Sequence, residues 1–257
     1  MPRYLGQHFL NNPTIVTDIV NSSQIDESTT VLEIGPGGGV LTEELCAKAQ
    51  RVVAIELDDK LADNLKEKFA NQKNLELIFA DILQINLPQL LKEREIKNYK
   101  VVANIPYYIT SKIIRLFLET SHQPESLTLM VQKEVAQRIV AKPGQMSKLS
   151  ASVQYYAQAE ILFAVKKENF DPPPEVDSSV IKIFNLRKID KDIDKQFFKI
   201  VRAGFCARRK TLINNLSNSL HIDKQKIAAD LATLELSPQT RAQELSIENW
   251  LKLSQLL

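Results

Sequence analysis

The residues Asn104-Ile105-Pro106-Tyr107 combine side chains that could hold a planar amine. Asn104 offers a carbonyl oxygen that accepts hydrogen bonds, and Tyr107 offers a flat aromatic face. Pro106 fixes its own φ angle and favours an extended conformation at Ile105. The backbone carbonyls of this turn are therefore expected to point into a pocket rather than into a helix.

Such a turn could direct the methylation of a purine amine without a nucleophilic side chain or a metal. That amine is a poor nucleophile because its lone pair is delocalised into the ring. Acceptors that hold both amine hydrogens favour a pyramidal nitrogen and stabilise the positive charge that develops on it. Reaction with a sulfonium methyl group then depends mainly on alignment. At an arbitrary place in a chain, the same four residues would be only a capped turn.

A glycine-rich turn lies earlier in the chain, in the run Glu33-Ile34-Gly35-Pro36-Gly37-Gly38-Gly39. Glycine permits positive φ angles and lets the backbone approach a ligand closely. The spacing differs from the G-x-G-x-x-G fingerprint of dinucleotide-binding proteins, and no Gly-Lys-Ser/Thr is present to hold a triphosphate. On its own, the run could be an ordinary turn between a strand and a helix.

Two acidic residues, Glu56 and Asp81, stand at the ends of the next two expected strands. A carboxylate at Glu56 can accept hydrogen bonds from both hydroxyls of a ribose. A carboxylate at Asp81 can accept one from the exocyclic amine of an adenine, with Ile82 as an apolar wall. Each acid alone would more often be a helix N-cap or a solvated loop residue. With the glycines they form a row at one edge of a sheet, which suits an adenosine-bearing cofactor whose polar tail lies near the glycines.

The pattern of apolar residues predicts the elements that would position these groups. Runs rich in β-branched residues predict five strands, over residues 30–35, 51–55, 75–79, 99–103 and 126–131. Helical spacing predicts connecting helices over residues 40–47, 59–69, 111–119 and 133–140. Two further strands are expected as a hairpin at one edge, over residues 159–165 and 178–185. The expected fold is α/β and Rossmann-like, with a mostly parallel seven-stranded sheet between helices.

The pattern changes near residue 186. Helical periodicity continues over residues 194–203, 208–220, 223–231 and 246–256, while glycines and β-branched runs largely disappear. We therefore expect an α/β domain over residues 1–186 and a small all-α domain over 187–257. Residues 185–257 carry 13 Lys and Arg against 8 Asp and Glu, whereas the preceding residues carry 20 against 23. This charge indicates an anionic macromolecular partner, although a solvated helical face would explain it equally well.

Three adjacent cations lie in this second domain. Arg208, Arg209 and Lys210 fall at the expected start of a helix, where the helix dipole does not favour positive charge. Contacts with nucleic-acid phosphates would explain why they cluster. The alternative is a solvated basic turn.

Composition excludes several classes of protein. The 257 residues are 44% hydrophobic and 25% charged, which is typical of a globular chain that can bury a sizeable core. The apolar runs are far short of a membrane span, and the first ten residues lack the pattern of a signal peptide. Two cysteines, Cys46 and Cys206, are too few for a disulfide framework or a zinc site. We expect a cytoplasmic protein with no membrane partner and no metal cofactor.

Three further segments narrow the class of protein. They are Gly6-Gln7-His8-Phe9-Leu10, Phe170-Asp171-Pro172-Pro173-Pro174-Glu175-Val176-Asp177-Ser178 and Arg208-Arg209-Lys210-Thr211-Leu212. Together with residues 104–107 and the glycine-rich turn, they resemble the motifs of the KsgA/Dim-type rRNA adenine dimethyltransferases. The resemblance covers nearly the whole chain in the right order. It implies a class I methyltransferase domain followed by a small helical domain.

The same resemblance implies an enzyme that uses S-adenosylmethionine to dimethylate the N6 amines of two adjacent adenines. In that family the adenines lie in a hairpin near the 3′ end of small-subunit (16S) rRNA, and the modification contributes to small-subunit biogenesis. The expected partner is small-subunit rRNA or the immature small ribosomal subunit. The expected working state is a monomer.

Roles for individual residues also follow from the resemblance. The expected cofactor-binding residues are His8, Leu10, Gly35, Glu56, Asp81 and Asn104. The expected catalytic residues are Asn104, Pro106, Tyr107 and Phe170. Asn104 would hold the target amine, and the two aromatic rings would stack the flipped adenine between them. The expected RNA-binding residues are Arg208, Arg209 and Lys210.

Two positions depart from the family pattern. His8 stands where many members have Asn, but either side chain can donate a hydrogen bond, so the cofactor contact should survive. Residues 146–150 lack the Tyr-Gly that usually precedes Leu-Ser, which leaves the shape of that loop open.

Three other protein classes stay open. An Erm-type enzyme would modify large-subunit rRNA, but the segments 170–178 and 208–211 favour the small-subunit enzyme. A ribosome assembly factor could have secondary or lost methyl transfer, which the intact motif at 104–107 opposes. A mitochondrial transcription-factor relative would carry a transit peptide, and the first residues do not resemble one.

Overall fold

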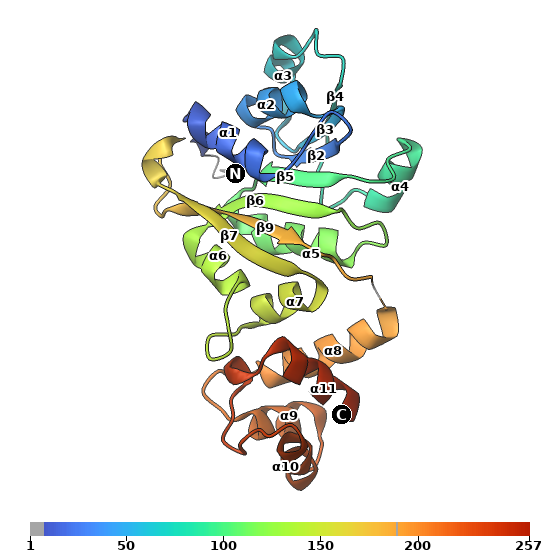
Figure 1. Cartoon of the computed structure of the whole chain (residues 1–257), viewed down its shortest axis with the longest axis vertical. Coiled ribbons are helices and arrows are strands. Elements are labelled where there is room, and N and C mark those ends of the chain that lie inside the picture. Colours follow the sequence, from blue (N-terminus) through green and yellow to red (C-terminus); the bar gives the residue numbers. More distant parts are fainter. Residues whose placement is uncertain (1–7, 189) are drawn as a thin grey trace. The chain divides into compact units, whose positions relative to one another are not determined.

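The computed structural model describes residues 8–188 and 190–257, and the chain divides into two compact units. An α/β unit extends to Ala136 and includes Ala157–Leu186. A helical unit contains Gln137–Tyr156 and Arg187–Leu257. Figure 1 colours the chain from blue at the N-terminus to red at the C-terminus.

The α/β unit is built on a seven-stranded sheet. Its strands are β2 (Thr30–Ile34), β3 (Arg51–Glu56), β4 (Leu75–Phe79), β5 (Lys100–Asn104), β6 (Ser126–Gln132), β7 (Gln158–Val165) and β9 (Ser178–Phe184). The strand order is β4-β3-β2-β5-β6-β9-β7. The first five strands are parallel, and β9 is antiparallel to both of its neighbours. The predicted mostly parallel sheet with a hairpin at one edge is confirmed.

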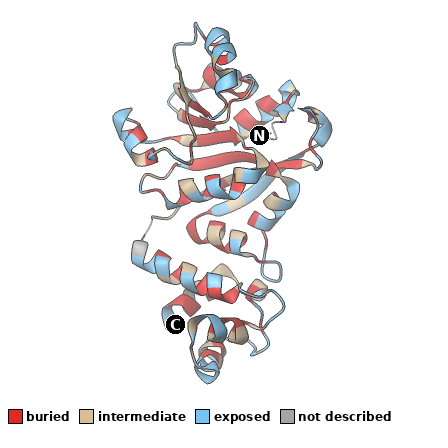
Figure 2. Ribbon diagram, turned by 180° about the vertical axis from the view of Figure 1, so that it is seen from behind, coloured by how far each residue is buried: buried red, intermediate tan, exposed pale blue. Residues whose placement is uncertain are grey.

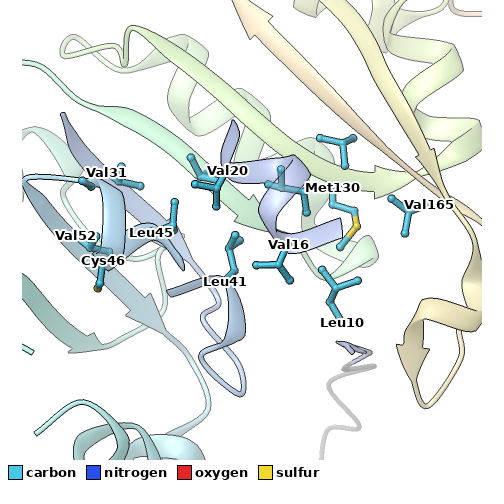
Figure 3. Close-up of a cluster of buried hydrophobic side chains, with 14 of the residues drawn as sticks. Leu10, Val16, Val20, Val31, Leu41, Leu45, Cys46, Val52, Met130 and Val165 are labelled. Atoms are coloured by element: carbon cyan, nitrogen blue, oxygen red, sulfur yellow. The ribbon is translucent and has the colours of Figure 1, made fainter. Parts of the chain in front are cut away.

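Helices cover both faces of this sheet, which explains why its central strands have continuous apolar runs. On one face, α1 (Pro13–Ser22) and α2 (Val40–Lys48) pack against Val31, Val52 and Met130 (Figure 3). The strands β2, β3 and β5 are buried almost throughout (Figure 2). The other helical elements of the unit are η1 (Asp59–Leu61), α3 (Ala62–Lys68), α4 (Leu87–Glu93), η2 (Tyr107–Ile109), α5 (Thr110–Glu119), η3 (Lys167–Asn169) and α6 (Lys133–Ile139), which continues into the second unit.

The order in which the chain adds strands to the sheet reverses between β2 and β5. The chain proceeds from β2 to β3 and β4 on one side, and from β5 to β6 on the other. Ligands of open α/β sheets bind at the carboxyl ends of the strands next to such a reversal. The glycine-rich turn follows β2 and Asn104 ends β5, so both motifs lie at this point.

A separate two-stranded sheet joins distant parts of the chain. β1 (Phe9–Leu10) pairs antiparallel with β8 (Phe170–Asp171), with Phe9 opposite Asp171 and Leu10 opposite Phe170. Asn12 extends the connection, because its Nδ2 donates to Oδ1 of Asn169 over 2.8 Å. The pairing brings the N-terminal box and the proline-rich segment together.

The helical unit contains α7 (Lys148–Tyr156), α8 (Lys191–Gly204), α9 (Leu212–Leu220), α10 (Lys224–Thr233), η4 (Ala242–Glu244) and α11 (Ile247–Leu256). Residues 137–156, which the sequence pattern assigned to the first domain, group with these helices. The hydroxyls of Tyr155 and Tyr156 donate to the buried carboxylate of Asp194 on α8, over 2.6 and 3.0 Å. The Tyr155 ring also stacks on Phe197 with 3.9 Å between centroids.

Three helices, α1, α4 and α7, were not predicted. The signal for the first two is present, because Asn12 and Asn86 are N-caps and a proline follows each of them at the start of the helix. No helix in residues 8–188 or 190–257 is long and apolar enough to cross a membrane.

Candidate functional site

A pocket lies at the carboxyl ends of β2, β3 and β5. It brings together five of the six residues expected to bind the cofactor and all four of the residues expected to be catalytic. Its lining comprises His8, Phe9, Leu10, Glu33, Gly35, Pro36, Gly37, Gly38, Val40, Leu41, Glu56, Asn104, Ile105, Pro106, Tyr107 and Phe170. Residues from five separate stretches of the sequence, 8–10, 33–41, 56, 104–107 and 170, therefore meet around one cavity.

The glycine-rich turn forms one wall of this pocket. Gly35 has a φ angle of +70°, and its N–H donates to the carbonyl of Ile55 over 2.9 Å. No atom lies within 4 Å of the place where a Cβ of residue 35 would be. The wall at Gly35 is thus bare backbone, which leaves room for a ligand to approach closely.

Replacing Gly35 with alanine is expected to weaken cofactor binding at least tenfold. A β-carbon at a left-handed backbone angle costs about 1–2 kcal/mol, and the added methyl group would also occupy the pocket wall. The matched control is Gly144→Ala, because Gly144 also has a positive φ (+98°) and open space around it but does not line the pocket. Titration calorimetry with S-adenosylmethionine measures both variants, and equal affinities for the two would contradict this use of the turn.

Glu56 connects the turn to the end of β3. Its side chain is buried, with Oε2 accepting from the N–H of Gly37 over 3.0 Å and Oε1 accepting from the N–H of Asp58 over 2.9 Å. Each carboxylate oxygen has two acceptor sites, so one on each oxygen stays open. The arrangement orients Glu56 and leaves it able to accept hydrogen bonds from a pair of hydroxyls.

Asp81 lines an adjoining pocket rather than the first one. The two pockets share Gly35, Glu56 and Pro106, and the second adds Ile34, Ile55, Leu57, Ala80, Asp81, Ile82, Tyr108 and Ile109. Asp81 Oδ1 accepts from the N–H of Leu83 over 2.9 Å. The residues that only the second pocket contains are mostly apolar, with Asp81 as their one carboxylate, which suits an adenine ring with its exocyclic amine.

Glu33 is a pocket residue that the sequence pattern did not single out. It is 1% exposed, lies on β2, and its Oε2 has no hydrogen-bond partner in the described part of the chain. Burial raises the pKa of Glu33 to about 8; the Thr42 hydroxyl lowers it, and the Glu56 carboxylate adds to the rise. The sequence did contain a signal for this residue, because Glu33 is a charged residue in a strand otherwise rich in Val, Leu and Ile. A buried carboxyl with an open acceptor fits a cationic group in the ligand.

The turn after β5 holds the second motif. Asn104 pairs with Met130 of β6, and its side chain makes no hydrogen bond with any described residue. Pro106 has a φ angle of −54°, and its carbonyl accepts from the N–H of Ile109 over 3.1 Å. The Ile105 carbonyl accepts no backbone hydrogen bond from the described residues. Two acceptors, the Asn104 side chain and the Ile105 carbonyl, are therefore left for a ligand.

Tyr107 is held by neighbours from two other segments. Its ring stacks on that of His8, with 6.0 Å between centroids and an angle of 26° between planes. Its hydroxyl lies 2.7 Å from Ser178 Oγ. No ring contact joins Tyr107 to Phe170 within the described residues, although both line the pocket and Phe170 is buried.

His8 uses one ring nitrogen within the protein. Its Nδ1 lies 2.7 Å from the carbonyl of Pro172, and since a carbonyl can only accept, Nδ1 carries the proton. In the neutral ring, Nε2 is then an acceptor. The donated hydrogen bond expected from His8 goes to the proline-rich segment, and a neutral His8 would offer a ligand an acceptor instead.

Comparison with known proteins decides the family. Residues 2–257 match the family described as ribosomal RNA adenine dimethylase. The chain belongs to this family. Its relatives include the "Ribosomal RNA small subunit methyltransferase A" of Dehalococcoides mccartyi, 45% identical over 97% of this chain and 86% of the relative. The protein of the same name from Enterococcus faecalis is 41% identical over 98% of this chain and 89% of the relative. The protein is thus an rRNA adenine dimethyltransferase.

Solved structures agree with the family. The dimethyladenosine transferase of Plasmodium falciparum has a TM-score of 0.79 and 27% identity, over 96% of both chains. The 23S rRNA methyltransferase ErmE has a TM-score of 0.78 and 26% identity, over 97% of this chain and 99% of ErmE. Because both match almost end to end, the dimethylase has the class I methyltransferase fold together with the helical region.

The basic cluster of the dimethylase precedes a helix rather than starting it. Arg208, Arg209 and Lys210 are exposed in the turn between α8 and α9, and Thr211 is the N-cap of α9. The helix predicted over residues 208–220 therefore begins at Leu212, which corrects the prediction. None of the three cations has an acidic partner among the described residues.

The turn that carries these cations is held in shape by hydrogen bonds from a buried side chain. The side chain of Asn215, 3% exposed, donates to the carbonyls of Gly204 and Ala207 over 2.6 and 3.0 Å. The Lys210 N–H donates to the Ala207 carbonyl over 3.1 Å. The three cations are presented on an ordered turn, with their charges available to an anionic partner.

Proposed function

We propose that the dimethylase uses S-adenosylmethionine to convert adenines of small-subunit rRNA to N6,N6-dimethyladenines. The observation that carries this proposal is the Asn104 turn, with two acceptors that the described protein does not use, in a pocket shared with the glycine-rich turn. The cofactor supplies an electrophilic methyl group attached to a sulfonium. The pocket residues described above fit such a molecule. The Glu56 carboxylate matches its ribose, the apolar wall with Asp81 matches its adenine, and the buried Glu33 carboxyl matches its ammonium.

The proposed cofactor-binding residues follow from that fit. Glu56 would accept hydrogen bonds from the ribose hydroxyls, and Asp81 would accept one from the adenine amine. Glu33 would face the ammonium group. Gly35 provides the close backbone wall, and Leu10 and His8 close the pocket from the N-terminal side. Asn104 would stand where the region proposed for the cofactor meets the region proposed for the target adenine.

Asn104 and Ile105 would hold the target amine. With one hydrogen of the amine bonded to the Asn104 side chain and the other to the Ile105 carbonyl, its lone pair is directed away from both acceptors. The same acceptors stabilise the positive charge that develops on nitrogen. Pro106 would keep the turn rigid, because its ring fixes φ. Tyr107 and Phe170 would stack against the two faces of the flipped adenine. This stacking would offset the cost of extruding the base, which is roughly a few kcal/mol.

The small-subunit target is supported by the relatives. The two relatives named for the small subunit are 45% and 41% identical to this chain, whereas ErmE, named for 23S rRNA, is 26% identical. Two adjacent adenines in a hairpin near the 3′ end of that rRNA, within an immature small subunit, are the proposed target. A ribosomal substrate also makes the cytoplasm the proposed place of action.

Competition between two RNAs tests the target. Labelled S-adenosylmethionine and the dimethylase are incubated with immature small subunits and with large-subunit RNA at equal concentrations. The proposal expects label in small-subunit rRNA only. Label in large-subunit RNA would move the protein to the Erm-type class, and binding without label in either RNA would favour an assembly factor that has lost methyl transfer.

The basic turn would bind RNA phosphates in this proposal. Replacing Arg208, Arg209 or Lys210 with alanine is expected to weaken binding to immature small subunits and to lower the salt-dependence slope by about 1 for each phosphate that is no longer neutralised. Filter binding at several salt concentrations measures the slope. Lys224→Ala is the control, because Lys224 is an exposed cation elsewhere in the same unit. An unchanged slope in a variant with all three of these cations replaced by alanine would contradict a phosphate-binding role.

A further inference from the structure

Ser178 connects Tyr107 to strand β9 of the seven-stranded sheet. Its side chain is 0% exposed, and it is the first residue of β9, where it pairs with Gln132 of β6 and Val165 of β7. Ser178 is therefore held by strands on both sides. The hydroxyl of Ser178 lies 2.7 Å from the hydroxyl of Tyr107.

Tyr107 itself stands on a much shorter element. It begins η2 (Tyr107–Ile109), a single turn whose N-cap, Pro106, makes no side-chain hydrogen bond. Burial raises the pKa of Tyr107, and the hydrogen bond with Ser178 lowers it. A neutral phenol can both donate and accept, so either hydroxyl can supply the proton in this bond. The bond to Ser178 fixes the far end of the Tyr107 side chain, which η2 alone would not do.

We propose that Ser178 is a positioning residue that fixes where the far end of the Tyr107 ring lies, and that it acts most strongly on the second methyl transfer. The inference rests on the proposed function, in which Tyr107 stacks the target adenine. In the first transfer the amine has two hydrogens, so Asn104 and Ile105 can both hold it. After that transfer the amine has one hydrogen left, so only one of these two hydrogen bonds can form. Alignment of the monomethylated base then depends more on the stacking surface.

Two substitutions remove the hydrogen bond from opposite ends. Ser178→Ala and Tyr107→Phe each delete one hydroxyl and keep the strand and the ring. Under single-turnover conditions, with immature small subunits and excess S-adenosylmethionine, nucleoside analysis gives the rates of formation of N6-methyladenosine and N6,N6-dimethyladenosine. We expect the second step to slow by about tenfold, the upper range for one neutral hydrogen bond, and the first step to slow much less. The double variant should resemble either single variant, because both remove the same bond.

Ser179→Ala is the matched control for packing. Ser179 is also buried, at 2% exposure, and lies next to Ser178 on β9, where strand alternation directs its side chain to the opposite face. This variant should keep the wild-type ratio of monomethylated to dimethylated product. If Ser178→Ala keeps that ratio as well, or slows both steps equally, the inference is wrong.

One more variant separates failure of this inference from failure of the proposed function. Tyr107→Ala removes the stacking ring entirely. If Tyr107→Ala loses methyl transfer while Ser178→Ala behaves as wild type, the stacking role stands and only the positioning role of Ser178 is overturned. If Tyr107→Ala transfers both methyl groups at the wild-type rate, the stacking role fails and the inference fails with it.

Discussion

Replacing Asn104 with alanine is expected to lower kcat for methyl transfer by roughly 10²–10³-fold, the usual loss when one preorganised group that stabilises developing charge is removed. Asn104 offers an acceptor that no described residue uses, at the carboxyl end of β5. Without it, the target amine keeps one acceptor, and the lone pair is no longer directed. The affinity for S-adenosylmethionine should change far less than kcat, because Glu56 and Asp81 still hold the cofactor in the proposed arrangement.

The control for that experiment lies at the other end of the same strand. Asn98 is exposed just before β5, and Asn98→Ala should leave both kcat and cofactor affinity at wild-type values. Titration calorimetry and single-turnover transfer separate binding from chemistry. An Asn104→Ala variant that kept wild-type kcat would show that the amine is held elsewhere.

Glu33 gives the second large effect, a pH-dependent cofactor affinity. Its pKa of about 8 means that the carboxyl is mostly protonated at pH 7 in the free protein. If an ammonium group of the cofactor lies against it, the bound state favours the carboxylate and a proton is released on binding. The affinity should then rise by about tenfold per pH unit up to the pKa and level off above it.

Titration calorimetry in buffers of different ionisation enthalpy measures that proton. At pH 7 we expect release of nearly one proton per cofactor in the wild type and none from Glu33→Gln, whose affinity at pH 8 should fall by roughly 10–100-fold for the loss of one charged hydrogen bond. Glu43→Gln is the control, because Glu43 follows on α2 but is exposed and pairs with Lys68. Proton release that is the same in wild type and Glu33→Gln would contradict the contact with the cation.

Glu33 should also make the stability of the cofactor-free protein depend on pH. A carboxyl whose pKa is raised in the folded state contributes its full stability below the unfolded pKa of 4.5 and loses it as the pH rises toward 8. Removing the ionisable group should abolish this trend. In the absence of cofactor, Glu33→Gln is therefore expected to be more stable than wild type at pH 8, as measured by denaturant unfolding.

The sheet and much of the pocket could be predicted from the sequence because their signals are local. Each parallel strand is a short apolar run, and Glu56 and Asp81 stand where such runs end. Parallel strands place their carboxyl ends at one edge, so strand ends alone predicted which residues would gather. Glu33 did not stand out because it lies inside a strand, where the pattern indicates burial but not whether the carboxyl finds a partner.

Contacts between distant segments could not be predicted in the same way. The stack of His8 on Tyr107, the bond from His8 to Pro172 and the bond from Tyr107 to Ser178 all depend on the pairing of β1 with β8 or on the position of β9. No periodicity encodes a pairing of two-residue strands so far apart in the chain. The resemblance to a family indicated that these segments matter, but not how they touch.

Two features of the helical unit also differ from the sequence-based predictions. The grouping of α7 with α8 depends on the hydroxyls of Tyr155 and Tyr156, which satisfy the buried carboxylate of Asp194. Tyrosine and aspartate at those positions are equally compatible with a surface helix. The position of the basic turn depends on Thr211 as an N-cap, a signal that the charge cluster before it obscured.

Whether the dimethylase forms N6,N6-dimethyladenosine in small-subunit rRNA is decided by identifying the modified nucleoside. Immature small subunits are treated with the dimethylase and S-adenosylmethionine, their rRNA is digested, and the nucleosides are identified by mass. We predict N6,N6-dimethyladenosine at two adjacent positions near the 3′ end with the wild type, and its loss with Asn104→Ala. A methyl group on any atom other than adenine N6, or undiminished dimethyladenosine from Asn104→Ala, would contradict this prediction.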